Sequence, residues 1–190
     1  KARQEAIFTK TTQLFPNDFR AYNNLGEMAF AAGDAAKAES FFKQAAAKNA
    51  NAPEVNANLG LVELVKNNVA AAETFLGKAT GANAANEALG NLYIKQGQYQ
   101  RAVNAFGDAK TNSAAQAQIL AKDYNKAKAT LEAIKDKDAM TDYLMAIVGA
   151  RTNNESLVKS SIKSAIAKDA SLATKAANDR EFAKFASILK

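Results

Sequence analysis

The clearest alternation of apolar and polar positions lies between residues 86 and 106, where it predicts two short amphipathic helices. Apolar residues recur three and four positions apart in each half, and the halves meet at Gly97-Gln98, a pair suited to a tight turn. Gly90 and Ala102 are small enough to let two helix backbones approach closely. The positions that share a face are Leu89, Leu92, Tyr93 and Gln96 in the first helix and Tyr99, Ala102, Val103 and Phe106 in the second. The segment is therefore predicted to be an antiparallel helix pair.

Two features of this pair recur along the whole chain in one uneven register. The turn is repeated at Gly33-Asp34, Asn67-Asn68, Gly97-Gln98, Lys122-Asp123 and Asn153-Asn154. A small residue follows each turn at the same distance, at Ala38, Ala72, Ala102, Ala127 and Val158. Because two independent features keep the same spacings, the sequence predicts five helix pairs.

The sequence from Leu89-Gly90 to Tyr93, followed by Ala102 and Phe106, resembles the tetratricopeptide repeat, as found in bacterial proteins. This resemblance implies an all-α fold, a right-handed superhelical solenoid of antiparallel helix pairs. Abundant alanine and only two prolines agree with closely packed helices.

We expect a single repeat domain over residues 1–190. Residues 1–16 end at Pro16 and are expected to be the second helix of a repeat whose first helix lies upstream. The repeats are predicted at about 18–50, 52–81, 83–110, 111–136 and 138–168. Residues 169–190 are predicted to cap the last repeat, with Phe182, Phe185, Ile188 and Leu189 on one face. The uncovered face of the first helix, with Ile7, Phe8 and Leu14, is a candidate for self-association.

The composition excludes several kinds of chemistry. The chain has no Cys and no His, so zinc centres, thiol nucleophiles and histidine acid–base catalysis are not available. The acid pairs Glu54 with Glu63 and Asp136 with Asp138 have no partner base in the sequence, and no glycine-rich phosphate loop is present. We therefore expect no enzyme activity, no metal and no cofactor.

The net charge of +6 does not by itself indicate a nucleic-acid-binding protein. Lys and Arg are spread among nearly as many acids, which favours a solvated helical surface, and no nucleic-acid partner is expected. The longest apolar runs are too short for a membrane span.

The resemblance implies that the first helices of successive repeats line a concave face that binds a protein or peptide. The candidate partner-binding residues are Arg20, Asn23, Asn24, Glu27, Phe30, Glu54, Asn58, Leu61, Glu87, Asn91, Ile94 and Lys95. The amides of Asn24, Asn58 and Asn91 can grip an extended main chain, or they can simply be solvated. Phe30, Leu61, Leu64 and Ile94 form an apolar stripe that either faces the partner or packs between repeats. We expect Asn24 and Asn58 to face solvent.

The charged clamp that such repeats use for chaperone C-termini is not matched, because Asn23, Ala84 and Ala88 occupy its cationic positions. Two functions remain open. The first is a non-enzymatic interaction scaffold that binds a peptide or protein segment, of unknown identity, on the concave face. The second is a structural spacer in a larger cell-envelope or secreted protein. The composition, rich in Ala, Asn and Lys and free of Cys, is similar to that of repeat regions of bacterial envelope proteins. The sequence leaves the location open, and this similarity favours the periplasm or cell envelope, as part of a larger protein.

Overall fold

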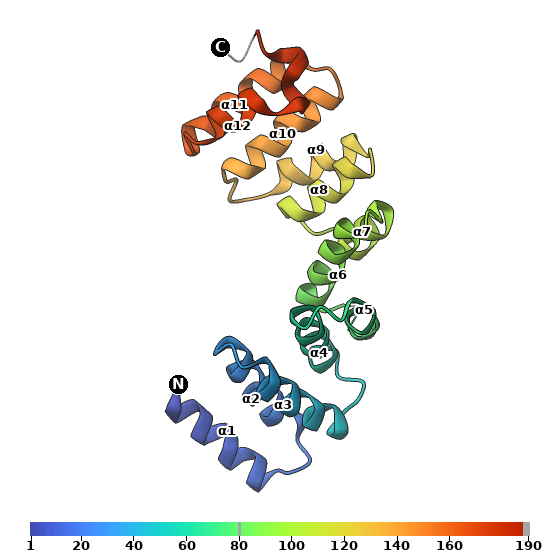
Figure 1. Ribbon diagram of the computed structural model, residues 1–190, viewed down its shortest axis with the longest axis vertical. Helices are drawn as coiled ribbons and strands as arrows, with labels where there is room; N and C mark the ends of the chain where they lie inside the picture. Colours follow the sequence, from blue (N-terminus) through green and yellow to red (C-terminus); the bar gives the residue numbers. More distant parts are fainter. Residues whose placement is uncertain (80, 188–190) are drawn as a thin grey trace. The chain divides into compact units, whose positions relative to one another are not determined.

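The computed structural model describes residues 1–79 and 81–187, and all of the regular structure in these ranges is helical (Figure 1). The helices are α1 (Ala2–Leu14), α2 (Phe19–Ala31), α3 (Ala35–Lys48), α4 (Pro53–Val65), α5 (Val69–Lys78), α6 (Asn83–Lys95), α7 (Tyr99–Phe106), α8 (Asn112–Leu120), α9 (Tyr124–Ala133), α10 (Ala139–Arg151), α11 (Glu155–Lys168), α12 (Leu172–Asn178) and the 3-10 helix η1 (Arg180–Phe185). The chain forms two compact units, residues 1–89 and 90–190, and the boundary between them falls within α6.

All five predicted turns are confirmed by the backbone. The first residue of each has a positive φ: Gly33 (85°), Asn67 (61°), Gly97 (72°), Lys122 (64°) and Asn153 (54°). The N–H of the following residue donates to the carbonyl oxygen five positions earlier: Asp34 to Ala29 (3.0 Å), and Asn68 to Glu63, Gln98 to Tyr93, Asp123 to Gln118 and Asn154 to Gly149 (2.8 Å each). This is the hydrogen bond that closes a helix in a Schellman motif. The first helix of each pair therefore ends the same way, whichever residue occupies the left-handed position.

The helices of a pair touch where the sequence places its small residues. Ala38, Ala72, Ala102, Ala127 and Val158 are all completely buried. In the first three pairs a glycine of the first helix lies against a large side chain of the second. A Cβ on Gly90 would fall 2.5 Å from Phe106 Cε2, one on Gly60 would fall 2.6 Å from Leu76 Cγ, and one on Gly26 would collide with the Phe42 ring. The predicted close approach at Gly90 is confirmed.

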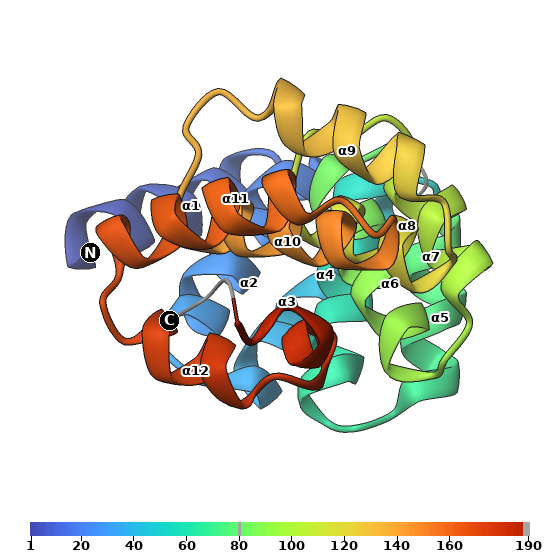
Figure 2. The ribbon, with the colours of Figure 1, turned by 90° about the horizontal axis from the view of Figure 1, so that it is seen from above.

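The last helix pair is covered by α12 and η1. In both views of the ribbon α11 runs beside α10, and their shared core continues into Phe182 and Phe185 of η1, which are buried (Figures 1 and 2). The Tyr143 ring meets Phe182 edge to face, with centroids 5.5 Å apart. The Tyr143 hydroxyl donates to Asp179 Oδ2 at 2.7 Å, and burial of that hydroxyl raises the pKa of Tyr143. Phe182 and Phe185 of the predicted cap are thus buried against the last helix pair, whereas Ile188 and Leu189 lie outside the described residues. The assignment of residues 169–190 as a cap stays a prediction.

The first helix is covered on one side only. α1 packs against α2, yet it contains no buried residue, and Ile7, Leu14 and the following Phe15 are more than half exposed. Of the apolar face predicted for this helix, Phe8 is half-buried while Ile7 and Leu14 are left exposed by the described chain, and its role in self-association stays a prediction. None of the described helices is both long enough and apolar enough to cross a membrane.

Candidate partner-binding surface

Helices α2 and α4 lie next to each other in the first unit, and their sequences fix where each begins. Asp18 caps α2 by accepting the Arg20 N–H at 3.0 Å, and its carboxylate also accepts from the Arg20 guanidinium. These bonds lower the pKa of Asp18 to about 2. Pro53 opens α4, where its missing N–H costs no helical hydrogen bond. The beginning of each helix is therefore defined by residues close to it in the sequence.

Three polar side chains link α2 to α4. Asn23 Nδ2 donates to Glu27 Oε1 at 2.9 Å, one turn along α2. Asn58 Nδ2, from α4, donates to Asn23 Oδ1 and to Glu27 Oε1, both at 3.0 Å. Asn23 is only 5% exposed, Asn58 is half-buried and Glu27 is exposed. We call these three residues the Asn23–Glu27–Asn58 cluster.

The cluster leaves hydrogen-bond acceptors unused at the surface. Among the described residues, Glu27 Oε2 and Asn58 Oδ1 receive no hydrogen bond, and the half-buried Asn24 amide makes none. A carboxylate oxygen and an amide oxygen held by their own bonds present acceptors in fixed positions. The arrangement therefore suits a ligand that donates hydrogen bonds, such as the main chain of an extended peptide.

The structure corrects how the asparagines were expected to lie. Asn58 does not simply face solvent, because it is half-buried and hydrogen-bonded to Asn23. Asn24, which occupies the place equivalent to Asn58, is half-buried as well and takes no part in that contact. Asn23 was expected only as one of the residues on the partner-binding concave face. It is instead buried, and it lies at the centre of the Asn23–Glu27–Asn58 cluster.

The other candidate residues of α2 and α4 surround the cluster. Arg20 and Glu54 are exposed at the beginnings of their helices, and Arg20 pairs with Asp18 at 2.5 Å. Leu61 is half-buried, while Phe30 packs in part against the core of the first unit. Together with Asn24 and the cluster, Arg20, Phe30, Glu54 and Leu61 form what we call the α2–α4 surface.

The four candidates on α6 lie on either side of the boundary between the two units. Glu87 belongs to the first unit, and Asn91, Ile94 and Lys95 belong to the second. Glu87 and Lys95 are exposed, whereas Asn91 and Ile94 are half-buried, as is Leu64 on α4. Their part in binding stays a prediction, and the candidate site is built from α2 and α4.

Glu63, for which the sequence offers no partner base, has two hydrogen-bond donors in the structure. It is 7% exposed and accepts hydrogen bonds from Asn68 Nδ2 at 2.7 Å and from Lys66 Nζ at 3.1 Å. The Asn68 bond is the main cause of its lowered pKa, and Lys66 adds to it while also pairing with Glu39 at 3.0 Å. Neither partner acts as a base, and the contacts of Glu63 serve the turn between α4 and α5.

Asp138, like Glu63, makes hydrogen bonds that stabilise the fold. Its side chain accepts the Thr141 N–H at 2.7 Å, and the Thr141 hydroxyl accepts the Asp138 N–H in return, which completes a capping box for α10. Asn112 Nδ2 from α8 donates to the same carboxylate at 3.0 Å. Hydrogen bonds, led by that from the Thr141 backbone, lower the pKa of Asp138.

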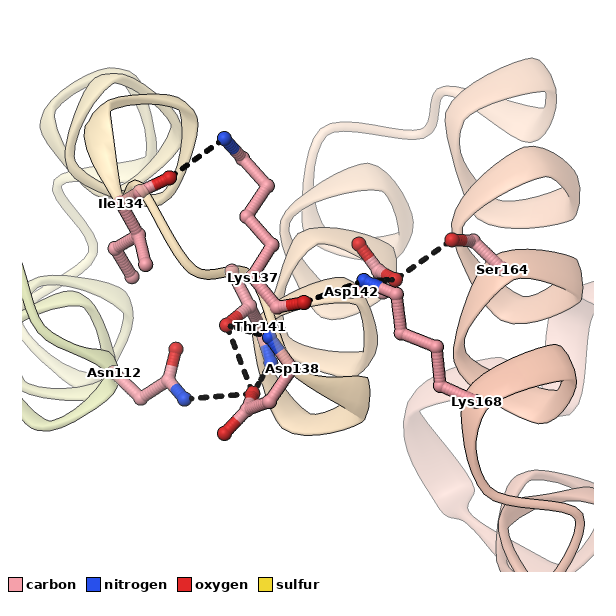
Figure 3. Close-up of polar contacts among 8 residues, drawn as sticks. All are labelled: Asn112, Ile134, Lys137, Asp138, Thr141, Asp142, Ser164 and Lys168. Carbon is pink, nitrogen blue, oxygen red and sulfur yellow. Dashed lines mark hydrogen bonds and ion pairs between the residues drawn. The ribbon is translucent and has the colours of Figure 1, made fainter.

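The loop before α10 is held by further bonds of this kind, shown in Figure 3. Lys168 Nζ of α11 contacts the Lys137 carbonyl oxygen at 2.7 Å and Asp142 Oδ2 at 2.8 Å. Lys137 Nζ donates to the Ile134 carbonyl oxygen at 2.8 Å, and the Ser164 hydroxyl donates to Asp142 at 2.7 Å. These contacts tie the loop to its own helix pair and to the next.

Asp138→Ala is expected to lower the free energy of unfolding by about 1 kcal/mol at neutral pH, the usual cost of losing such a cap. Because the folded-state pKa is lowered, this contribution is present above the ordinary aspartate pKa of about 3.9 and is lost as the pH falls through the folded pKa. Urea unfolding at pH 7 and pH 3 should show the difference from wild type shrinking. Asp136→Ala, at an exposed neighbour, is the matched control. An equal loss in both variants would contradict the capping role.

The matches to known protein families lie where the helix pairs recur along the chain. A tetratricopeptide repeat profile matches residues 29–93, and a second one matches residues 84–114. No curated protein sequence matches the chain.

In the described residues no group of three or more acids is placed to hold a metal ion.

Solved structures of repeat proteins superpose on most of the chain. YrrB, described as a repeat protein with an unusual peptide-binding site, is 19% identical, with a TM-score of 0.66 over 85% of this chain and 92% of its own. PilW, a type IV pilus biogenesis factor, is 18% identical, with a TM-score of 0.66 over 95% and 88%. PilF of Pseudomonas aeruginosa is 13% identical, with a TM-score of 0.72 over 95% and 86%.

At these identities the superpositions show the fold alone. The fold is the tetratricopeptide type of antiparallel helix pairs, a general protein-interaction scaffold, and proteins of this type are typically not enzymes. The two repeat profiles match residues 29–114, and over this range the chain contains tetratricopeptide repeats.

Proposed function

We propose that the protein is a non-enzymatic interaction scaffold whose α2–α4 surface binds an extended segment of a partner polypeptide. The observation that carries the proposal is the Asn23–Glu27–Asn58 cluster, which bridges two neighbouring helices and keeps acceptor atoms at the surface. An extended segment has main-chain N–H groups that need acceptors. The α2–α4 surface supplies a carboxylate and two amides for them.

The cluster favours binding because it is already ordered. Asn23, Glu27 and Asn58 fix one another through three hydrogen bonds, so little side-chain freedom remains to be lost when a ligand arrives. A hydrogen bond to the Glu27 carboxylate contributes about 1.5–3 kcal/mol, and one to an amide about 0.5–1.5 kcal/mol. Leu61 and the exposed part of Phe30 offer apolar contacts beside these acceptors.

A similar fold that binds peptides supports the proposal in general terms. YrrB, which shares 19% identity with this chain, is described as having an unusual peptide-binding site. That description gives a precedent for peptide binding on this fold, and it assigns no residue of this chain. The residues proposed here rest on their own contacts.

Glu27→Gln is expected to weaken peptide binding about tenfold without unfolding the protein. The glutamine oxygen can keep the bonds from Asn23 and Asn58, so the change removes mainly the charge that strengthens a donor's hydrogen bond. The binder is a fluorescent peptide selected from a random displayed library on the full chain, and the measurement is its anisotropy. Asn24→Ala should weaken binding by a smaller, several-fold factor.

Two controls separate binding from stability. Lys43→Ala, at an exposed position of α3, should leave affinity unchanged. Asn58→Ala should lower both affinity and melting temperature, because it leaves the buried Asn23 oxygen without its donor. If Lys43→Ala weakens binding as much as Glu27→Gln, or if no α2 or α4 variant changes it, the surface is not the site. The structural-spacer interpretation would then be preferred.

A further inference from the structure

The second unit contains an open hollow between α8, α10 and α12. It has a volume of about 430 Å³, within the range of small-ligand and side-chain pockets. It is lined by Asn112, Ser113, Gln116, Met140, Tyr143, Leu144, Ile147, Lys175 and Asp179. None of these residues belongs to the α2–α4 surface, so this hollow is independent of the function proposed above.

One wall of the hollow is apolar. Met140, Leu144 and Ile147 lie along α10, and Met140 is 38% exposed although it is a large apolar side chain. Leu144 is nearly buried and Ile147 is half-buried, so both are held by the core of the second unit. This wall therefore offers a rigid apolar contact that one bulky side chain of a partner can fill.

Helix α12 contributes a cation, Lys175, to the lining of the hollow. Lys175 Nζ stands over the Tyr143 ring, 4.8 Å from its centroid, and makes no ion pair within the part of the chain that the structure describes. The carboxylate of the hollow is engaged elsewhere, because Asp179 accepts from the Tyr143 hydroxyl at 2.7 Å and from the Glu181 N–H at 3.0 Å. Lys175 therefore stands over an aromatic ring without a direct ion pair, while Asp179 keeps its negative charge in the same hollow.

A third observation concerns Asn112 at the edge of the hollow. Its Nδ2 is bound to Asp138, while its buried Oδ1 has no donor among the described residues. A buried amide oxygen without a donor is unusual in a folded protein. The hollow thus combines an apolar wall, an unpaired cation and an unsatisfied amide oxygen.

The charge of the chain is concentrated in the same unit. Residues 90–190 contain 16 Lys and Arg against 10 Asp and Glu, whereas residues 1–89 contain nine of each. The entire net charge of +6 therefore belongs to the second unit. A field of this sign attracts acidic partners and raises their association rate.

We infer that the α8–α10–α12 hollow binds an acidic segment of a partner protein. One bulky apolar side chain of the segment packs against Met140, Leu144 and Ile147, and a neighbouring Asp or Glu pairs with Lys175. A nucleic acid fits less well, because the hollow has a single cation, a carboxylate and an apolar wall in place of a row of cations.

The test uses the full chain and three short fluorescent peptides. The first has one Phe between Glu residues, the second replaces that Phe by Ala, and the third replaces the Glu residues by Lys. The first peptide should bind, and the other two should bind at least tenfold more weakly. Equal binding of the Phe and Ala peptides would overturn the apolar part of the proposal.

Two variants with the same change of charge locate the binding. Lys175→Gln should weaken binding of the first peptide about fivefold or more, whereas Lys163→Gln, at an exposed position of α11, should change it less than twofold. Equal losses would show that the whole basic unit attracts the peptide and that the hollow does not. A labelled single-stranded oligonucleotide that binds more tightly than the peptide would contradict a protein partner. Because Glu27→Gln should not affect this peptide, the two proposals can fail separately.

Discussion

Phe182→Ala is expected to lower the free energy of unfolding by about 3–5 kcal/mol, the usual cost of removing a buried aromatic side chain. Phe182 is 1% exposed and shares a core with residues of α10 and α11. Its ring also meets Tyr143 edge to face, an arrangement that adds to the area it buries. Urea unfolding of the full chain measures the loss, and hydrogen exchange in α10 and α11 shows whether the second unit is where it occurs.

The exposed Lys184 of the same short helix provides the control, since Lys184→Ala should change stability by less than about 0.5 kcal/mol. A loss below about 1 kcal/mol for Phe182→Ala would contradict the account of η1 as a cover for the last helix pair. Unchanged exchange in α10 and α11 would contradict it as well.

Gly90→Leu should cost about 2–3 kcal/mol of stability. Even a Cβ at this position would lie 2.5–2.8 Å from three atoms of the Phe106 ring, so a whole leucine side chain must push α6 and α7 apart. Overpacking of this kind usually costs 1–3 kcal/mol or more. Helix propensity acts in the opposite direction by about 1 kcal/mol and does not outweigh it.

Gly77 supplies a control in which only propensity operates. It lies within α5, and a Cβ there would meet nothing within 4 Å. Gly77→Leu should therefore raise the free energy of unfolding by several tenths of a kcal/mol or more in the same urea titration. If Gly90→Leu proves as stable as wild type, the close approach of α6 and α7 does not hold in solution.

The helix pairs could be predicted from the sequence because two signals shared one register. Lys122 shows this best. Nothing in the propensity of lysine favours a positive φ, yet its place in the register predicted the turn where φ is 64°. Likewise, Gly90 and Phe106 were predicted on facing helices, and their contact is the one that the structure shows.

The polar contacts of the candidate site could be predicted only in part. Asn23 and Asn58 meet because of the offset between α2 and α4, which depends on packing between repeats and not on the register of either helix. Asn24 and Asn58 occupy equivalent places in successive repeats, and the sequence therefore suggested that these two residues act together. A local signal did exist for Glu63, since Lys66 and Asn68 follow it closely enough to bond to it.

The hollow of the second unit had no signal in the sequence. Lys175 and Asp179 follow the last helix pair in the sequence. In the structure they lie beside residues of α8 and α10, and this placement forms the hollow. No periodic pattern relates these segments, so only the folded chain brings them together. The sequence already shows that residues 90–190 carry more basic than acidic side chains. The structure adds that these residues form one compact unit, so the excess positive charge belongs to that unit.

The most direct measurement of the central claim is a map of backbone amide shifts in an isotope-labelled chain as the library-selected peptide is added. The account predicts that the largest changes fall within α2 and α4, around Asn23, Asn24, Glu27 and Asn58, and that they disappear in Glu27→Gln at the same peptide concentration. Changes confined to α3 and α5, or to residues 90–190, would contradict peptide binding at the α2–α4 surface.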